Sequence, residues 1–554
     1  MAVGSFCLVL HGHLPWVLHH GKWPHGEVWL YEAAAQTYLP LLAILAEGGC
    51  PLTLGLTPIL LEQLASPHFQ RGFVRWLEEQ IARGVRDAAE FAARGDGHLA
   101  FLAECWQKRY AALAEQFEGI GRDLPAAFAR LDRKGSVEIL TSNATHGYMP
   151  LIRHDASSRA QVRAGVHTSE RILGFRPRGA WLPECAYRPA GPWTPPVLDR
   201  TPVWRAGVEE IFAHEGVGFF IVDAHLVAGA RSEGVMEGGN FRKVDWAQAE
   251  WDAPRGWRNV LTPHGISSDG GPARLVALAR HPEVSEQVWS GEVGYPGDGR
   301  YLEFHKRHGN DGLHYWKVTA PRTGLGDKQA YVPDDVPAAL YSHAQHFAAT
   351  VRSLLIRHRE KVGRPGVVIA PFDAELFGHW WHEGPGFIRE VMAALKGADV
   401  EASTVSARLA AHPPETVVTL PEGSWGAGGD HRVWLNEEMT WVWEAAHRAE
   451  DRFLDMLHQL PWRENASVGV ALRAAARELL LLQASDWAFV IHTRGAVDYG
   501  YRRFCEHLAR FDRAGNIAGA RAAGQADDEI TRAELADMSL HDECFADLDL
   551  EWWL

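Results

Sequence analysis

Short apolar runs recur along the chain, and each leads into a polar residue that could take part in chemistry. The runs cover residues 5–13, 51–58, 137–147, 178–184, 217–225 and 366–375. Between them, apolar positions repeat about every 3.6 residues, as at Leu99, Leu102 and Trp106, which predicts amphipathic helices. Strands that alternate with helices predict a parallel α/β sheet or barrel. In such folds the active site forms at the carboxyl ends of the strands, which is where these polar residues fall.

Two regions interrupt the alternation. The pattern of residues 61–130 predicts a helical excursion, that is, a helical insertion between two strands, with helices over about 72–94 and 98–118. Residues 190–262 contain Gly- and Pro-rich loops around one strand, and 229–241 has the composition of a mobile loop. We therefore expect 190–262 to be an inserted subdomain that carries an active-site loop.

The character of the chain changes after about residue 412. From residue 436 onward, apolar residues recur mostly with the period of a helix, which predicts a C-terminal helical domain over 413–525. Residues 526–554 form an acidic tail. The α/β part then consists of two segments, 1–189 and 263–412.

Composition excludes several classes of protein. With 554 residues, 46% hydrophobic and 23% charged, the chain is globular. Its 55 Lys and Arg against 70 Asp and Glu give a net charge of −15, without the basic footprint of a nucleic-acid binder. We find no run of 18 or more apolar residues and expect no membrane span. The first apolar run ends at His11, which predicts a strand instead of a signal peptide.

The six cysteines are scattered without a close pair, so we expect free thiols in a reducing cytoplasm. Tryptophan is unusually frequent: 23 Trp outnumber 22 Phe, beside 29 His. Burial in a large core explains any single Trp equally well. As a group they favour a sugar-binding protein, because indole rings offer flat apolar faces with a polar edge.

The segment HGHLPW (11–16) contains two histidines on one face of a strand, because His11 and His13 are two residues apart. They could be metal ligands, but no local third ligand accompanies them. They could also have no functional role. The third interpretation, which we favour, is that they donate hydrogen bonds to a polar substrate.

Carboxylates follow two of the apolar runs. In AWLPECAYRP (180–189), Glu184 follows an apolar run and has an arginine nearby that could keep it ionised, as a nucleophile requires. A purely structural ion pair between Glu184 and Arg188 explains the pattern equally well. In APFDAELFGHWW (370–381), Asp373 and Glu375 lie at another strand exit. Two carboxylates from different strands are what glycosidic cleavage requires, and nearby aromatics would raise the pKa of the acid. Spacing does not choose between Asp373 and Glu375, and a helix-capping acidic pair is the alternative.

Three further segments give weaker signals. Residues 289–306 could form a substrate-binding loop or a plain connector. The Gly-rich segment 421–434 carries Trp425 and Trp434 where their rings would be exposed. In LLQASDWAF (481–489), Asp486 and Trp487 lie on a helix, where a buried Trp is the simpler interpretation. None of the Gly-rich runs both follows a strand and begins a helix, which excludes a nucleotide-binding site built on a Gly-rich loop.

Taken in order, HGHLPW, GLTP, WLPECAYRP, PFDAELFGHWW and LLQASDWAF resemble the five signature segments of glycoside hydrolase family 57. The segments GKWPHGEVWLYEA (21–33) and GYPGDGRYLEFHK (294–306) resemble those of its 1,4-α-glucan branching enzymes in particular. The resemblance covers about residues 1–525. It implies an α/β fold, an incomplete (β/α)7 barrel with a small inserted subdomain and a C-terminal all-helical domain that contributes to the glucan cleft.

The resemblance also implies roles for individual residues, with no metal and no cofactor. Glu184 matches the nucleophile of a retaining mechanism, and Asp373 matches the general acid/base. Three histidines match the subsite of the cleaved sugar, four tryptophans match the glucan cleft, and two residues match the contribution of the C-terminal domain. These substrate-binding residues are His11, His13, His146, Trp23, Trp289, Trp425, Trp434, Asp486 and Trp487.

The implied activity is cleavage of an α-1,4-glucan and transfer of the segment to a 6-hydroxyl, as in glycogen biosynthesis. The expected partners are glucan donor and acceptor chains such as amylose and glycogen, with no nucleic acid or membrane and as a monomer or small homo-oligomer. The chain departs from the family in one respect, because residues 225–262 lack the tyrosine expected near the tip of a loop over the cleft. The alternatives are a mainly hydrolytic α-amylase or 4-α-glucanotransferase of the same family, a non-catalytic glucan-binding protein and a metal-dependent carbohydrate deacetylase.

Overall fold

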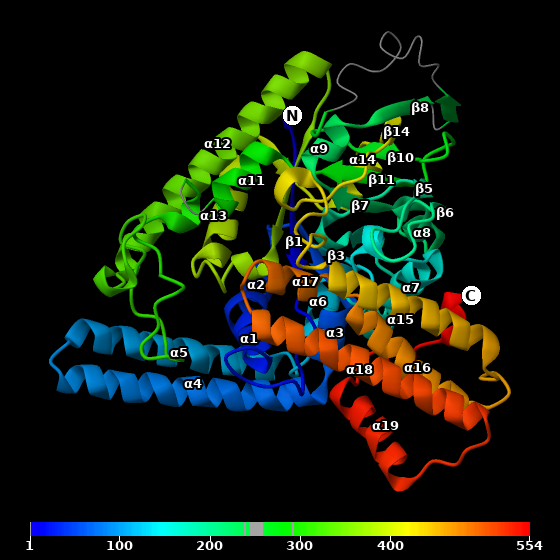
Figure 1. Cartoon of the computed structure of the whole chain (residues 1–554). Helices are drawn as coiled ribbons and strands as arrows, with labels where there is room; N and C mark the ends of the chain where they lie inside the picture. Colours follow the sequence, from blue (N-terminus) through cyan, green and yellow to red (C-terminus); the bar gives the residue numbers. More distant parts are fainter. Residues whose placement is uncertain (1, 238–239, 244–258, 291–292) are drawn as a thin grey trace.

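The structure is a computed structural model that describes residues 2–237, 240–243, 259–290 and 293–554 (Figure 1). Strands alternate with helices over most of the chain, which confirms the α/β class. The strands are β1 (Gly4–Gly12), β2 (Leu52–Leu56), β3 (Val137–Leu140), β4 (Gly179–Trp181), β5 (Gly191–Trp193), β6 (Val203–Arg205), β7 (Phe219–Val222), β8 (Arg231–Glu237), β9 (Asn240–Lys243), β10 (His264–Ile266), β11 (Leu275–Ala279), β12 (Val367–Asp373), β13 (Val400–Ala402) and β14 (Thr416–Thr419).

The central strands pair in two sheets, and both edge strands of the first sheet are joined to strands of the second. One sheet has the order β12-β1-β2-β3, and the other begins β4-β7-β11. Single parallel bridges join Thr141 to Ala180 and Arg280 to Ile369. Among the described strands, parallel pairing therefore runs through β1, β2, β3, β4, β7, β11 and β12 and returns to β1. The carboxyl ends of all these strands consequently lie at one mouth of the ring.

Alternate residues of these strands pack together inside the ring. Cys7 and Val9 of β1 belong to one buried cluster with Ile221 of β7, Leu278 of β11 and Ile369 of β12. Side chains along a strand alternate between its two faces. The residues two and four positions further along the same faces therefore continue the interior toward the mouth.

Helices surround the ring and extend from it (Figure 1). They are α1 (Glu27–Ala33), the π-helical turn η1 (Ala34–Tyr38), α2 (Leu39–Glu47), α3 (Pro58–Ala65), α4 (Pro67–Ala93), α5 (Gly97–Gly119), α6 (Leu124–Arg133), α7 (Asp155–Leu173), α8 (Val208–His214), α9 (Ala224–Ala228), α11 (Pro282–Trp289), α12 (Val336–Val362), α13 (Gly384–Gly397), α14 (Val405–Ala411), α15 (Thr440–Gln459), α16 (Ala466–Leu482), α17 (Ser485–His492), α18 (Val497–Ala522) and α19 (Glu529–His541). The long α4–α5 hairpin projects at the lower left of Figure 1.

The two helices predicted in the excursion are α4 and α5, but α4 begins at Pro67, five residues before the predicted start. The Ser66 hydroxyl accepts a hydrogen bond from the backbone N–H of His68, and Pro67 occupies the first turn. Both features favour a helix start at this point. The Asp96 carboxylate caps α5 in the same way, through the N–H of Leu99.

The segment predicted as an insert, 190–262, contributes to the ring. Its strand β7 pairs with both β4 and β11, so this part of the segment is not separate from the α/β unit. The prediction of a loop over 229–241 is wrong for residues 231–237 and 240–241, because they form β8 and the start of β9, and β8 is held by antiparallel pairing to β14. Residues 238–239 and 244–258 of the predicted active-site loop lie outside the described residues.

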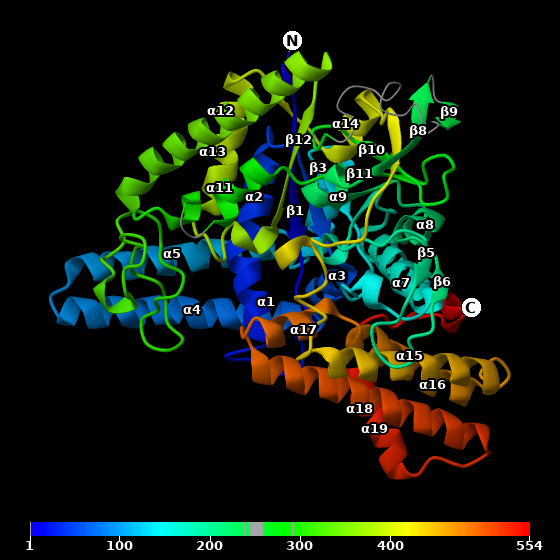
Figure 2. The ribbon, with the colours of Figure 1, turned by 45° about the horizontal axis from the view of Figure 1, so that its top comes forward.

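The C-terminal helices α15, α16 and α18 lie beneath the ring in the view of Figure 2. The segment predicted as an acidic tail contains α19 and the 3₁₀ turn η9 (Leu550–Trp553). Leu550 and Trp553 are buried, so apolar burial orders the end of the chain.

In the part of the chain that the structure describes, the helical stretch 27–47 is long and apolar enough to cross a membrane by length and composition. The expectation that no segment could do so was too strong. Of the most apolar window in this stretch, 78% is buried inside the protein. Such burial is typical of a core helix, which passes the same test.

Gly378 offers a test of close packing beside the ring. It has φ +128°, and a Cβ there would lie 1.9 Å from the carbonyl oxygen of Gln36. We expect Gly378→Ala to destabilise the fold by about 2 kcal/mol or more, because strain and overlap add. The matched control is Gly397→Ala, where a Cβ would meet no atom within 4 Å. The thermal unfolding midpoints of the two variants measure the effect. Equal midpoints would contradict the close packing of Gly378 against Gln36.

Candidate active site

Polar side chains from three strands meet at the mouth of the ring. His11 continues the inward face of Cys7 and Val9, and Asp373 continues that of Ile369. In the register of β1 and β12, His11 lies opposite Asp373. Glu184 follows β4 directly. The structure therefore brings together residues that the sequence separates by up to 362 positions.

Glu184 stands on a tight turn with both carboxylate oxygens bound. Its backbone is left-handed, with φ 58°, a conformation uncommon outside glycine and frequent at functional sites. Trp425 donates from Nε1 to Oε2 at 2.9 Å, and Ser485 donates from Oγ to Oε1 at 3.0 Å. Burial raises the pKa of Glu184 to about 7, although these two hydrogen bonds lower it.

The pKa of Asp373 is raised well above its ordinary value, first by burial and then by the charges of Glu375 and Glu184. Arg280 opposes this shift. Burial therefore favours the protonated form of Asp373, which is the form that a general acid needs. Glu184, whose pKa is raised to about 7, is partly ionised near neutral pH, as a nucleophile requires.

A chain of hydrogen bonds connects the histidines to Glu184. His11 Nε2 lies 3.0 Å from His146 Nε2, and His146 Nδ1 lies 2.8 Å from Ser485 Oγ. Because Ser485 donates its single proton to Glu184, it accepts from His146 Nδ1, and His146 Nε2 then accepts from His11. Burial lowers the pKa of both histidines well below the usual value, with His13 adding to the effect. Both are therefore neutral hydrogen-bonding groups.

His13 behaves differently because it faces a carboxylate. Its Nε2 lies 3.0 Å from Asp486, and its Nδ1 lies 3.1 Å from the Thr57 hydroxyl. Burial lowers the pKa of His13, but the charge and hydrogen bond of Asp486, with the charges of Glu375 and Glu184, outweigh this effect and raise the pKa above its usual value. Asp486 lies in the first turn of α17, so a C-terminal helix completes the site.

Glu375 is anchored inside the protein. It accepts hydrogen bonds from the Tyr38 hydroxyl and, at 3.2 Å, from the backbone N–H of His13. Burial raises its pKa to about 7, and the bond from Tyr38 opposes the shift. Asp373, two residues earlier at the end of β12, has no such anchoring bond among those described and remains available to a ligand.

The predicted tryptophans fall into two groups. Trp425 and Trp289 are half-buried near Glu184, with ring centroids 6.3 Å apart. Trp23 is exposed beside a cavity that it shares with the junction of α17 and α18. Trp434 and Trp487, in contrast, are fully buried.

The predicted contact of Trp434 and Trp487 with a ligand is therefore wrong for this structure. The Trp434 ring packs 4.6 Å from that of Tyr148, and Trp487 donates from Nε1 to the carbonyl of Leu481. The Gly-rich loop folds over Trp434, because Gly426 lies directly against its ring. These two buried rings therefore support the residues that line the site and do not line it themselves.

Several residues of the site gave no signal in the sequence. Ser485 bonds both His146 and Glu184, Tyr38 anchors Glu375, and the Arg280 guanidinium lies 5.7 Å from the Trp425 ring. Only Ser485 could have been suspected, since it precedes Asp486 in a recognised segment.

His13, His146 and Asp486 also present ligand atoms within 4.8 Å of one another, a spacing that could hold a metal ion. In this structure those atoms bond other protein groups: His13 binds Asp486, and both ring nitrogens of His146 bind His11 and Ser485. A metal ligand set here would therefore require these hydrogen bonds to be exchanged.

Comparison with known proteins gives consistent matches. Residues 7–421 match glycosyl hydrolase family 57, and residues 445–553 match the C-terminal family of 1,4-alpha-glucan branching enzymes. A 1,4-alpha-glucan branching enzyme of Thermococcus kodakarensis is 37% identical over 519 residues, covering 93% of this chain and 73% of that protein.

Solved structures match over the whole chain. The crystal structure of a GH57-type branching enzyme from Pyrococcus horikoshii has a TM-score of 0.88 and 34% identity, covering 100% of this chain and 97% of that chain. The structure of the alpha-amylase AmyC from Thermotoga maritima has a TM-score of 0.83 and 28% identity, covering 100% and 99%.

The ion pair of His13 and Asp486 predicts a pH-dependent stability. A histidine whose pKa is raised by folding stabilises the protein below its unfolded pKa of about 6.5, and this contribution is lost as pH rises through the raised value. Asp486→Asn should therefore lower the unfolding midpoint more at pH 6 than at pH 9. Asp512→Asn is the control, because Asp512 pairs with Arg452, and arginine side chains do not lose their proton in proteins. A loss for Asp486→Asn that is the same at both pH values would contradict a charged His13.

Proposed function

Because the chain belongs to glycosyl hydrolase family 57, we propose that it is a 1,4-alpha-glucan branching enzyme. The match of residues 445–553 to the branching-enzyme C-terminal family supports this over the amylase alternative. The identities of 37% and 34% to branching enzymes, against 28% to AmyC, support it further. The observation that carries the chemistry is the pair Glu184 and Asp373 at one mouth, both buried with raised pKa values and with α17 beside them.

In the first half-reaction, the ionised Glu184 attacks the anomeric carbon of an α-1,4-linked glucose. The bond between that carbon and the glycosidic oxygen breaks, and Asp373 gives its proton to the departing oxygen. The product is a β-glycosyl ester on Glu184, with a shortened chain released. Trp425 and Ser485 hold both oxygens of Glu184 in position for the attack.

In the second half-reaction, the 6-hydroxyl of an acceptor glucan attacks the same anomeric carbon. Asp373, now ionised, takes the hydroxyl proton, and the ester bond to Glu184 breaks. An α-1,6 linkage forms, and both carboxyl groups return to their starting states. Water can replace the acceptor, so branching requires that the acceptor sugar is bound better than water.

The remaining site residues bind the glucan in this proposal. His11, His13 and His146 line the subsite of the sugar whose linkage is cleaved, and they exchange hydrogen bonds now made to protein groups when they bind it. Trp425 and Trp289 contribute ring faces, each worth on the order of 1 kcal/mol if aromatic pairs are a guide. The ring of parallel strands would be the incomplete (β/α)7 barrel of the family, and α15 to α18 its C-terminal domain.

The physiological setting is part of the proposal. Donor and acceptor would be chains such as amylose and glycogen, with the enzyme a monomer or small homo-oligomer active in glycogen biosynthesis. All six cysteines are free, and four are buried, which supports a reducing cytoplasm.

A mainly hydrolytic enzyme is the second candidate. Residues 225–262 lack tyrosine, and a loop that fails to shield the glycosyl enzyme would let water compete with the acceptor. Residues 244–258 of this loop lie outside the described residues. Only the products of the reaction separate the two candidates.

The first test uses amylose, with reducing ends counted before and after treatment with a debranching enzyme. We expect the wild type to produce new ends mainly after debranching, whereas a hydrolase would produce them at once. Glu184→Gln and Asp373→Asn should each lower the rate at least on the order of 10³-fold. Glu375→Gln, the matched control, should cost no more than on the order of 10²-fold, because it acts through position. A rate for Glu375→Gln below that of Asp373→Asn would reverse the assignment of the acid.

The pH profile provides a second test. Glu184 must be ionised, so the rate should rise with pH through about 7, the raised pKa of this group. Asp373 must be protonated at first, so the rate should fall above its raised pKa. Trp425→Phe removes a hydrogen bond that favours the ionised carboxylate, and should move the rising limb to higher pH. Trp204→Phe, on the exposed hairpin of β5 and β6, should leave both limbs in place. A rising limb unchanged in Trp425→Phe would contradict this assignment.

A further inference from the structure

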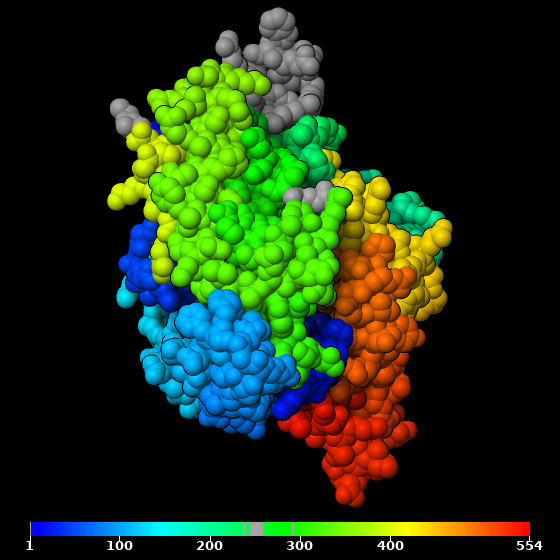
Figure 3. Space-filling model, turned by 90° about the vertical axis from the view of Figure 1, so that its left-hand side faces the viewer, coloured from blue at the N-terminus to red at the C-terminus, as the bar shows by residue number. Residues whose placement is uncertain are grey.

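The segment between His13 and Trp23 connects two parts of the candidate cleft. At its start, His13 contacts Asp486 on α17. At its end, Trp23 lines a cavity of about 670 Å³ whose other wall is the α17–α18 junction, including Arg494 and Tyr499. This volume is in the range of ligand pockets, roughly 300–1,000 Å³. In Figure 3 the N-terminal segment, in dark blue, reaches the surface between the light-blue α4–α5 hairpin and the orange C-terminal helices.

One side of this segment is fixed to the ring by a single glutamine. Gln63, on α3, donates from Nε2 to the carbonyls of Leu14 and Pro15, and its Oε1 accepts from the backbone N–H of Val17. Gln63 is itself fully buried. These bonds hold the first half of the segment and leave the half nearer the cavity to other contacts.

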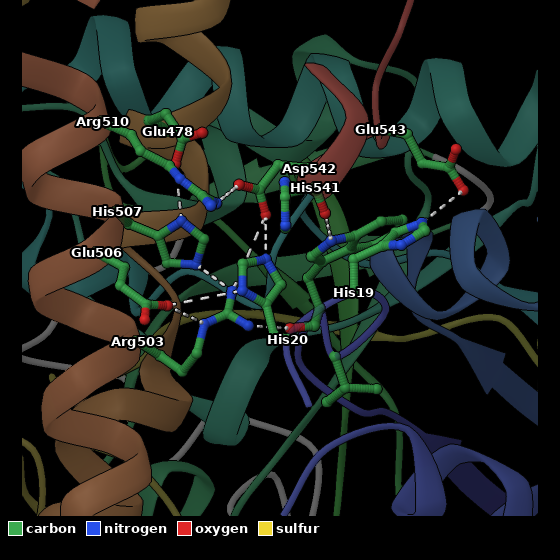
Figure 4. Close-up of polar contacts among 12 residues, drawn as sticks. His19, His20, Glu478, Arg503, Glu506, His507, Arg510, His541, Asp542 and Glu543 are labelled. Carbon is green, nitrogen blue, oxygen red and sulfur yellow. Dashed lines mark hydrogen bonds and ion pairs between the residues drawn. The ribbon is translucent and has the colours of Figure 1, made fainter. Parts of the chain in front are cut away.

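The other side is fixed by the C-terminal part of the chain (Figure 4). Trp16 donates from Nε1 to the carbonyl of His541 at 2.8 Å, and Arg503 of α18 donates to the carbonyl of Trp16 at 3.2 Å. His20 lies 2.9 Å from the Asp542 carboxylate and 3.6 Å from Glu506. Residues more than 480 positions apart therefore form one polar cluster.

Asp542 lies at the centre of this cluster and is fully buried. Arg510 binds its second oxygen, and Arg503 lies 3.9 Å from the first, the one that His20 also contacts. His507 accepts a hydrogen bond from Arg503 and donates to Glu478, so the guanidinium of Arg503 cannot turn away. A buried carboxylate with two guanidinium partners is ionised, and it compensates their charges. Burial raises the pKa of Asp542, and His20 and the neighbouring cations outweigh that effect and hold it well below its usual range.

We propose that Asp542 is a positioning residue, which holds the segment 14–23 against α18 and thereby fixes the wall of the cavity that carries Trp23. The proposal rests on the proposed function in one respect: we assign the cavity to the glucan chain that competes with water for the glycosyl enzyme. When the wall moves, the acceptor chain is bound less well, while water still reaches the site.

Two variants test the proposal. Asp542→Asn removes the charge with little change of shape, and His20→Leu removes the link to the segment but leaves Asp542 with both arginines. In each we expect the number of α-1,6 linkages formed per reducing end released to fall about three- to tenfold, since small displacements weaken positioning strongly. Backbone amide exchange in residues 14–23 should rise about tenfold, because the segment opens locally.

Glu450→Gln is the matched control. Glu450 is also a buried carboxylate that connects a C-terminal helix, α15, to the ring side of the protein, through the backbone N–H groups of Arg153 and His154. Among the described hydrogen bonds and ion pairs, those of Glu450 go to other residues than the segment 14–23. We expect this variant to lose stability but to keep the wild-type product ratio and the wild-type exchange of residues 14–23.

The outcomes separate a positioning role from a structural one. Folded Asp542→Asn or His20→Leu protein with the wild-type ratio and exchange would overturn the proposal, whatever its melting temperature. If Asp542→Asn does not fold, His20→Leu decides alone. If the wild type forms no α-1,6 linkages, the proposed function fails, and the exchange of residues 14–23 still decides whether Asp542 holds this segment.

Discussion

The site depends on the closure of a ring of parallel strands. Closure places every carboxyl end at one mouth, and the alternation of side chains makes every second residue point inward. Inside the ring, the inward-facing positions of β1 and β12 are apolar and include Cys7, Val9 and Ile369. At the mouth, the same faces of these strands carry His11 and Asp373. The hydrophobic core of the ring and the polar site above it are therefore parts of one pattern, and a shift of one residue in register would turn Asp373 away from the site.

Burying several carboxyl groups at one mouth is unfavourable, and the C-terminal part of the chain, from the loop that carries Trp425 to α17, relieves that cost. Ser485 and Trp425 donate to Glu184, and Asp486 gives His13 a counter-charge. Without these contacts from the last third of the chain, burial would drive Glu184 toward its neutral form. The helices thus tune the proton affinities of the site as well as covering it.

The same helices are tied to the ring by buried charges. Removing one partner of such a group typically costs about 3–5 kcal/mol, because the remaining charges stay buried without compensation. Asp542 compensates Arg503 and Arg510, and Glu450 fixes the backbone of Arg153 and His154. The segment beyond residue 526 therefore does not behave as a loose acidic tail, since it supplies the buried Asp542 and buries Trp553.

The sequence alone determined the α/β class, the helical excursion and the segments that carry Glu184, Asp373, His11 and His13, because periodicity and strand-end chemistry are local properties. It could not choose between Asp373 and Glu375 by spacing, and it mistook Trp434 for an exposed ring. For Trp487 the residues favoured burial, and only the family resemblance implied contact with a ligand. Those questions depend on what lies opposite each side chain: Tyr38 anchors Glu375, and Tyr148 packs on Trp434. Ser485, Arg280 and Asp542 also acquire their roles only through partners distant in the chain. Burial and pairing across hundreds of residues are decided by tertiary packing, which no local pattern encodes.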